Sequence, residues 1–298
     1  MKSDKEITRR RDFLKGVSVT TLAVLFAEKE LFAHVKKPSR IKPGLVTYLW
    51  GKDWDVPTII RNCEKTNLLG VELRTEHKHG VEPTLSSAQR REVRQRFKDS
   101  EVEFIGYGSN VEFDSPDPAE LRKNMDLAKE LVKLCHDVGG SGVKVKPNKF
   151  HENVPHEKTL EQIGRSLNEI AKFGSDYGQK IRLEVHGKGT QELPNIKAIM
   201  DVADNRNVVV CWNCNPTDLE GQGFSDNFNL VKDRLGDTIH IHELDTVPYP
   251  WQDLFNELVK MDYAGWTLWE CSSSPADPVA ALTQQRRIWA EMLAKAEK

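Results

Sequence analysis

Ile181-Arg-Leu-Glu-Val-His186 is a short apolar, β-branched run that ends in polar side chains, a pattern typical of a buried strand. Three later stretches share this form, each ending in a residue with a lone pair to donate: Val208 to Asn213, Thr238 to His242 and Trp266 to Glu270. The intervals from Glu184 to Asn213, then to His242 and Glu270, are 29, 29 and 28 residues. Because one strand-helix unit takes roughly 30 residues, these side chains are predicted to occupy equivalent positions on consecutive parallel strands.

Four earlier strands have the same apolar character. They are predicted at Lys42 to Trp50, Gly70 to Arg74, Val102 to Tyr107 and Gly142 to Lys146. Helical patterns alternate with all eight strands, at 55–67, 86–100, 117–140, 159–177, 193–203, 229–235, 251–261 and 277–295. Alternation at this regularity favours a parallel sheet, and eight units close into a barrel. We therefore predict an α/β protein whose residues 41–298 form one (β/α)8 TIM barrel.

The overall composition is that of an ordinary globular enzyme-sized domain. The 298 residues are 38% hydrophobic and 30% charged, with a formal net charge of −2. A nearly neutral chain lacks the basic surface that nucleic-acid binding requires. We expect no nucleic-acid partner.

The first 40 residues differ from the rest. Arg10-Arg11-Asp-Phe-Leu-Lys15, followed by a mildly apolar run over 17–27, resembles a bacterial twin-arginine signal. The apolar run is shorter than the roughly 20 residues that span a bilayer. We expect residues 1–40 to be a leader that engages the twin-arginine export machinery, giving a periplasmic protein. The alternative is a basic helix packed on one end of the barrel.

Export would place the five cysteines in an oxidising compartment. They are Cys63, Cys135, Cys211, Cys214 and Cys271. An odd number leaves at least one free thiol, and the Cys211, Cys214 pair has no second pair to form a zinc knuckle. We expect buried apolar roles, with a link from Cys211 or Cys214 to Cys271 as the alternative.

Candidate site residues collect where the strands end, the place where such barrels carry their chemistry. Two carboxylates, an imidazole and an amide oxygen from adjacent strands suit one divalent cation such as Mn²⁺, Mg²⁺, Co²⁺ or Zn²⁺. Candidate substrate contacts are Lys144, Lys146, His186, Trp50 and Glu72. His240 precedes His242 by two residues, so we expect it one layer deeper as a buried, hydrogen-bonded histidine. Asn215 is an alternative to Asn213 as a ligand.

These strand ends carry a resemblance. Leu183-Glu184-Val-His186, His240-Ile-His242-Glu-Leu-Asp245 and Leu268-Trp-Glu270, with the Asn213 strand between them, resemble the xylose isomerase-like TIM barrel superfamily. This superfamily contains sugar isomerases, epimerases and endonuclease IV. The resemblance implies Glu184, Asn213, His242 and Glu270 as metal ligands, and Glu184 and Glu270 as a catalytic acid/base pair. Most epimerases have Asp where Asn213 stands and His where Pro216 stands, so this chain departs from their pattern there.

Three functions follow. The first is a metal-dependent isomerase or epimerase that removes a proton beside the carbonyl of an unphosphorylated keto sugar, or a hydratase or lyase of 3-keto-glycosides and 3-keto-glycals on the same site. The second is a nuclease like endonuclease IV, which needs three zinc ions, further histidines and a basic groove. The third is a barrel that binds sugar without turnover.

Overall fold

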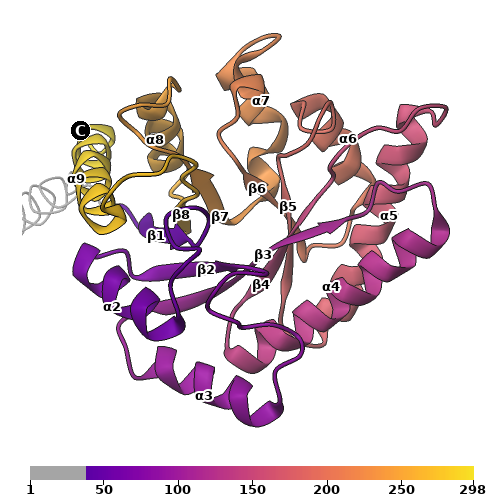
Figure 1. Cartoon of the computed structure of the whole chain (residues 1–298). Coiled ribbons are helices and arrows are strands. Elements are labelled where there is room, and N and C mark those ends of the chain that lie inside the picture. The colour runs from indigo at the N-terminus through magenta and orange to yellow at the C-terminus, as the bar shows by residue number, and fades with distance from the viewer. Residues whose placement is uncertain (1–37) are drawn as a thin grey trace, which may run out of the picture. The chain divides into compact units, whose positions relative to one another are not determined.

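The strands are short and apolar because each is buried on both faces of a parallel sheet. A computed structural model describes residues 38–298. In these residues eight strands pair in sequence order, all parallel, and β8 closes the barrel on β1 (Figure 1). The strands are β1 (Lys42–Val46), β2 (Gly70–Arg74), β3 (Glu103–Glu112), β4 (Gly142–Lys146), β5 (Lys180–Glu184), β6 (Val208–Trp212), β7 (Leu235–Ile241) and β8 (Trp266–Trp269).

Helices surround the barrel, each packing its apolar side on the strands (Figure 1). They are α2 (Val56–Thr66), α3 (Ser87–Lys98), α4 (Pro118–Val138), α5 (His156–Ser175), α6 (Leu193–Val202), α7 (Phe224–Val231), α8 (Trp251–Lys260) and α9 (Pro278–Ala296). Short 3₁₀ turns, η1 (Pro216–Leu219) and η2 (Lys232–Arg234), flank α7.

The helix ends follow from local chemistry. The Asp55 side chain accepts a hydrogen bond from the Thr58 backbone at the start of α2, and Ser86 forms a reciprocal capping box with Gln89 at the start of α3. Gly139 ends α4 in the left-handed conformation, with φ of 103°, which costs glycine nothing. These capping residues explain why the ends of α2, α3 and α4 could be predicted accurately from the sequence.

The predicted (β/α)8 barrel is confirmed. Two strands are longer than predicted: β3 continues to Glu112 and β7 begins at Leu235. The additional part of β3 includes Gly108, and a glycine weakens the interior of a strand because it has no side chain to pack. The structure shows why it is there. A β-carbon at Gly108 would collide with the side chains of Glu72 and Arg74 on the neighbouring strand.

A buried ion pair fills the amino-terminal end of the barrel. The fully buried Arg182 guanidinium donates to the Asp237 carboxylate at 3.0 and 3.1 Å, and to the Ser141 hydroxyl at 2.7 Å. Although burial opposes ionisation, Arg182 holds the pKa of Asp237 well below its ordinary value of 3.8. Gly106 and Gly142 leave the space that the guanidinium occupies.

The predicted leader lies outside the described residues, apart from its last three positions. None of the helices in residues 38–298 has the length and apolar character that crossing a membrane requires. The five cysteines are buried and unbonded, so the alternative link to Cys271 is not formed.

We predict that Asp237→Asn destabilises the barrel by about 3 kcal/mol at pH 7, near the lower end for breaking a buried pair, because Asp237 is a quarter exposed. A carboxylate with a depressed pKa stabilises the fold above pH 3.8 and loses this effect as the pH falls. The difference from wild type should therefore narrow below about pH 4 in urea unfolding. Asp262→Asn, which breaks an exposed pair with Arg40, is the control and should cost at most about 1 kcal/mol. Equal effects of the two substitutions would contradict this account.

Candidate functional site

A pocket of about 500 Å³ opens at the carboxyl ends of the strands. This volume is within the range of small-molecule sites, roughly 300–1,000 Å³. Six of its polar lining residues are Arg74, Lys146, Glu184, Asn213, His242 and Glu270. All four sequence-predicted metal ligands therefore border the same pocket.

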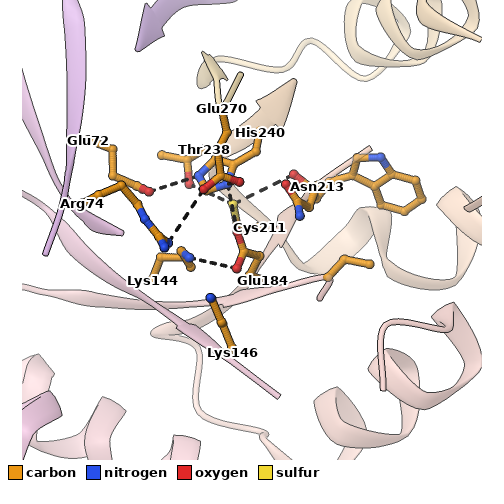
Figure 2. A network of polar contacts seen from close by, with 12 residues as sticks. Glu72, Arg74, Lys144, Lys146, Glu184, Cys211, Asn213, Thr238, His240 and Glu270 are labelled. Atoms are coloured by element: carbon orange, nitrogen blue, oxygen red, sulfur yellow. Dashed lines mark hydrogen bonds and ion pairs between the residues drawn. The ribbon is translucent and has the colours of Figure 1, made fainter. Parts of the chain in front are cut away.

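His240 on β7 lies at the centre of the polar network beneath the pocket (Figure 2). Its ring is completely buried. Nε2 lies 3.1 Å from a carboxylate oxygen of Glu72, while Nδ1 lies 3.1 Å from Glu184 and 3.3 Å from Glu270. One imidazole thus touches carboxylates from β2, β5 and the end of β8. Burial opposes protonation, but Cys211, Glu72 and Glu270 together raise the pKa of His240 well above its usual value.

Glu184 is held from two sides. Its Oε2 accepts a hydrogen bond from the Lys144 ammonium at 2.8 Å, and both side chains are almost inaccessible to solvent. Burial would raise the pKa of Glu184, but Lys144, and then His240, lower it well below the ordinary value. The carboxylate is therefore ionised and fixed in orientation.

Glu270 follows β8 and is 9% exposed, more than Glu184. The Arg74 guanidinium lies 3.8 Å from Glu270 Oε1. Burial and the charge of Glu184 both raise the pKa of Glu270, but His240 and Lys144 outweigh them and lower it to about 2. Two ionised carboxylates from β5 and β8 thus meet at one imidazole nitrogen.

Asn213 and His242 differ in what their side chains offer. The Asn213 Oδ1 atom is buried and has no hydrogen-bond partner. The His242 ring nitrogens lie 2.9 Å from the backbone oxygen of Glu270 and 3.0 Å from that of Asn213. His242 therefore joins the ends of β6 and β8 through their backbones, and its nitrogens do not reach the group formed by the two carboxylates.

These residues fit a divalent cation, with His240 in the place predicted for His242. Within residues 38–298, ligand atoms of Glu184, His240 and Glu270 lie within 4.8 Å of one another. Glu72 would accept the Nε2 proton of His240 and leave the Nδ1 lone pair facing the two carboxylates, as the partners of metal-bound histidines do. The unpartnered Asn213 oxygen is a fourth donor of the right chemistry.

The remaining predicted residues fall into two groups. Lys146 and His186 line the pocket, with pKa values lowered by burial. Trp50 and Glu72 do not line it. The Trp50 indole donates to the Ser273 backbone at 3.0 Å, and Glu72 supports His240 from below.

Sequence reasoning missed Arg74, which lies beside Asn110. Arg74 Nη2 and Lys146 Nζ each donate to the single Oδ1 of Asn110, both at 2.9 Å. The available signal was parity, since Arg74 is two residues from Glu72 on the same strand and so faces the same side.

The sequence from residue 60 to 293 matches the model of the xylose isomerase-like TIM barrel family. The chain belongs to this family. Similar solved structures include an L-ribulose 3-epimerase, with a TM-score of 0.73, 15% identity, and coverage of 86% of this chain and 95% of that one. A 3-keto-D-glucoside 4-epimerase from E. coli matches with a TM-score of 0.71, 14% identity, and coverage of 85% and 99%.

The IolI protein with a bound zinc atom matches with a TM-score of 0.72, 14% identity, and coverage of 85% and 98%. At such identities the likeness concerns the fold. No curated protein sequence matches this chain.

We predict that His240→Gln lowers divalent metal affinity at least about tenfold, because it removes a ligand nitrogen from the group. His242→Gln is the matched control, and should keep the metal while losing stability through its two backbone contacts. Metal content after dialysis, with thermal unfolding of the same samples, measures both effects. Loss of metal from the His242 variant alone would restore the original assignment.

Proposed function

We propose that this member of the family is a metal-dependent sugar isomerase or epimerase that removes a proton beside the carbonyl of an unphosphorylated keto sugar. The observation that carries the proposal is the meeting of Glu184 and Glu270 at one point of a sugar-sized pocket. The similarity of the fold to two sugar epimerases supports it.

Glu184, His240 and Glu270 would hold one divalent cation, with Asn213 as a further oxygen donor. When bound, such a cation supplies a Lewis acid that polarises the sugar carbonyl and acidifies the neighbouring C–H.

The two carboxylates have the properties of an acid/base pair. Both are ionised, so either can accept the α-proton of a bound sugar. A carboxylate of low pKa is a weak base, but fixed positioning against an acidified C–H reduces the barrier. Lys144 fixes Glu184 from inside the barrel, whereas Glu270 has more solvent access for exchange of the proton.

The roles of the two carboxylates differ by their surroundings. Glu184 is bound at both oxygens, to His240 and Lys144. The nearest atom of Arg74 to Glu270 is at 3.8 Å, beyond hydrogen-bonding distance. We assign removal of the α-proton to one carboxylate, and delivery of a proton to the opposite face to the other, after it has taken up that proton from solvent.

We predict that Glu184→Gln and Glu270→Gln each reduce solvent deuterium exchange into a keto sugar at least about 100-fold, the usual contribution of general acid/base catalysis. NMR of the metal-loaded protein in D₂O, with D-fructose, D-tagatose and a 3-keto-glucoside, measures both exchange and any elimination product. Glu192→Gln, at the start of α6, is the control and should exchange at the wild-type rate. Wild-type exchange in both site variants would remove these carboxylates from the chemistry.

We also propose that residues 1–40 direct the folded protein to the periplasm. Arg10-Arg11 and the following apolar run carry this proposal. Replacing both arginines by lysine should leave the protein in the cytoplasm, as cell fractionation of the expressing bacterium would show. Unchanged export of that variant would contradict a twin-arginine signal.

A further inference from the structure

Positive charge is in excess around the pocket. Among residues 38–298, the lysines and arginines that line it outnumber the lining carboxylates by one: Arg74, Lys146 and Lys188 against Glu184 and Glu270. A divalent cation at the site would add two further charges. Asn213, the amide beside the two carboxylates, contributes no charge. A negatively charged ligand would offset this positive charge.

Two of these cations are built into one place. Arg74, from β2, and Lys146, from β4, share the Oδ1 atom of Asn110 at 2.9 Å each. The Arg74 guanidinium carbon also lies 5.4 Å from the centre of the Tyr48 ring, a distance at which the ring stabilises the cation. The two positive charges repel each other, and an anion that contacts both would offset this repulsion.

The protein does not fill the hydrogen-bonding capacity of the Arg74 guanidinium. Arg74 is only 7% exposed, and its buried Nε atom has no hydrogen-bond partner. Its nearest carboxylate, on Glu270, is 3.8 Å away, too far for a hydrogen bond. Arg74 nevertheless lines the pocket, and the planar donors of a guanidinium match the oxygens of a carboxylate.

We infer that Arg74 and Lys146 form a subsite for the carboxylate of the substrate, which is therefore a keto sugar acid. This inference rests on the proposed function, because it places the anion beside the acid/base pair. The carboxylate lies toward β2 and β4, and the reacting carbon toward Glu184 and Glu270. Figure 2 shows Arg74 and Lys146 on the side of the network formed by these two strands.

The position of the cations favours a carboxylate over a phosphate. TIM barrels that bind phosphate usually do so with the loops after strands seven and eight. Here those loops contribute His242, Glu270 and Ser272 to the pocket, and no cation. The subsite lies instead over β2 and β4.

The test compares ligands that differ only at one end and have no carbonyl to react. D-Gluconate has a carboxylate where D-glucitol has a hydroxymethyl group. We expect the manganese-loaded wild-type protein to bind gluconate at least about tenfold more tightly than glucitol in calorimetric titration, the effect of one charge-assisted contact. Because neither ligand turns over, the preference is measurable even if the deuterium exchange experiment fails.

Variants locate the preference. Arg74→Gln and Lys146→Met should each bring the gluconate to glucitol ratio towards one, and Lys146→Arg should retain it. Lys146 is only half-buried, so its substitution keeps the test valid if Arg74→Gln does not fold. Lys149→Met removes a nearby lysine outside the pocket and should leave the ratio unchanged.

Three results would overturn the inference. Equal binding of gluconate and glucitol by the wild type would show that the pocket takes neutral sugars. A preference that persists in Lys146→Met would place the anion elsewhere. Tighter binding of D-glucitol 6-phosphate than of gluconate would assign the subsite to a phosphate.

Discussion

The contact of one buried imidazole with three carboxylates constrains the rest of this barrel. His240 touches Glu72, Glu184 and Glu270, which come from three different strands or their ends. Three negative charges inside a protein are stable only when each is paired. Lys144 contacts Glu184 at 2.8 Å, whereas Arg74 lies 3.8 Å from Glu270, and both cations are themselves buried. At the carboxyl ends of the strands, the barrel is therefore filled by charged side chains that can also bind a cation and a substrate. At the amino-terminal end it is filled by the ion pair of Arg182 and Asp237.

This arrangement explains residues that look odd in strands. Gly106 and Gly108 weaken β3 as a strand, but they create the space for Arg182 below and for Glu72 and Arg74 above. A barrel filled with apolar side chains would need no such openings. Glycines on one strand thus leave room for long charged side chains on the neighbouring strands. The chemistry of the pocket depends on this space.

The fold could be predicted from the sequence because its signals are local. Caps such as Asp55 and Ser86, the glycine after α4 and the apolar strands mark the units, and their spacing gives the barrel. The four strand ends also identified the pocket, since Glu184, Asn213, His242 and Glu270 all line it. The spacing of the strand ends could not show the direction in which each side chain points. His240 and His242 have the same parity, and the prediction placed His240 one layer deeper and chose His242 as the ligand.

The structure groups His240 with the carboxylates instead, because the chain has left the strand at His242 and its ring turns to two backbone oxygens. Arg74 was missed for a related reason. Its importance comes from Asn110 and Glu270, which are distant in sequence and carry no spacing rule. Trp50 was expected to face a sugar but packs inward, since its indole finds a backbone acceptor at Ser273.

The most direct test is a crystal structure of the protein soaked in Mn²⁺, with diffraction data collected to reveal the anomalous signal of manganese. Our account predicts one strong peak bonded to Glu184, to Nδ1 of His240 and to Glu270. A peak bonded to His242 instead, or full loading of the soaked crystal at a different place, would contradict it.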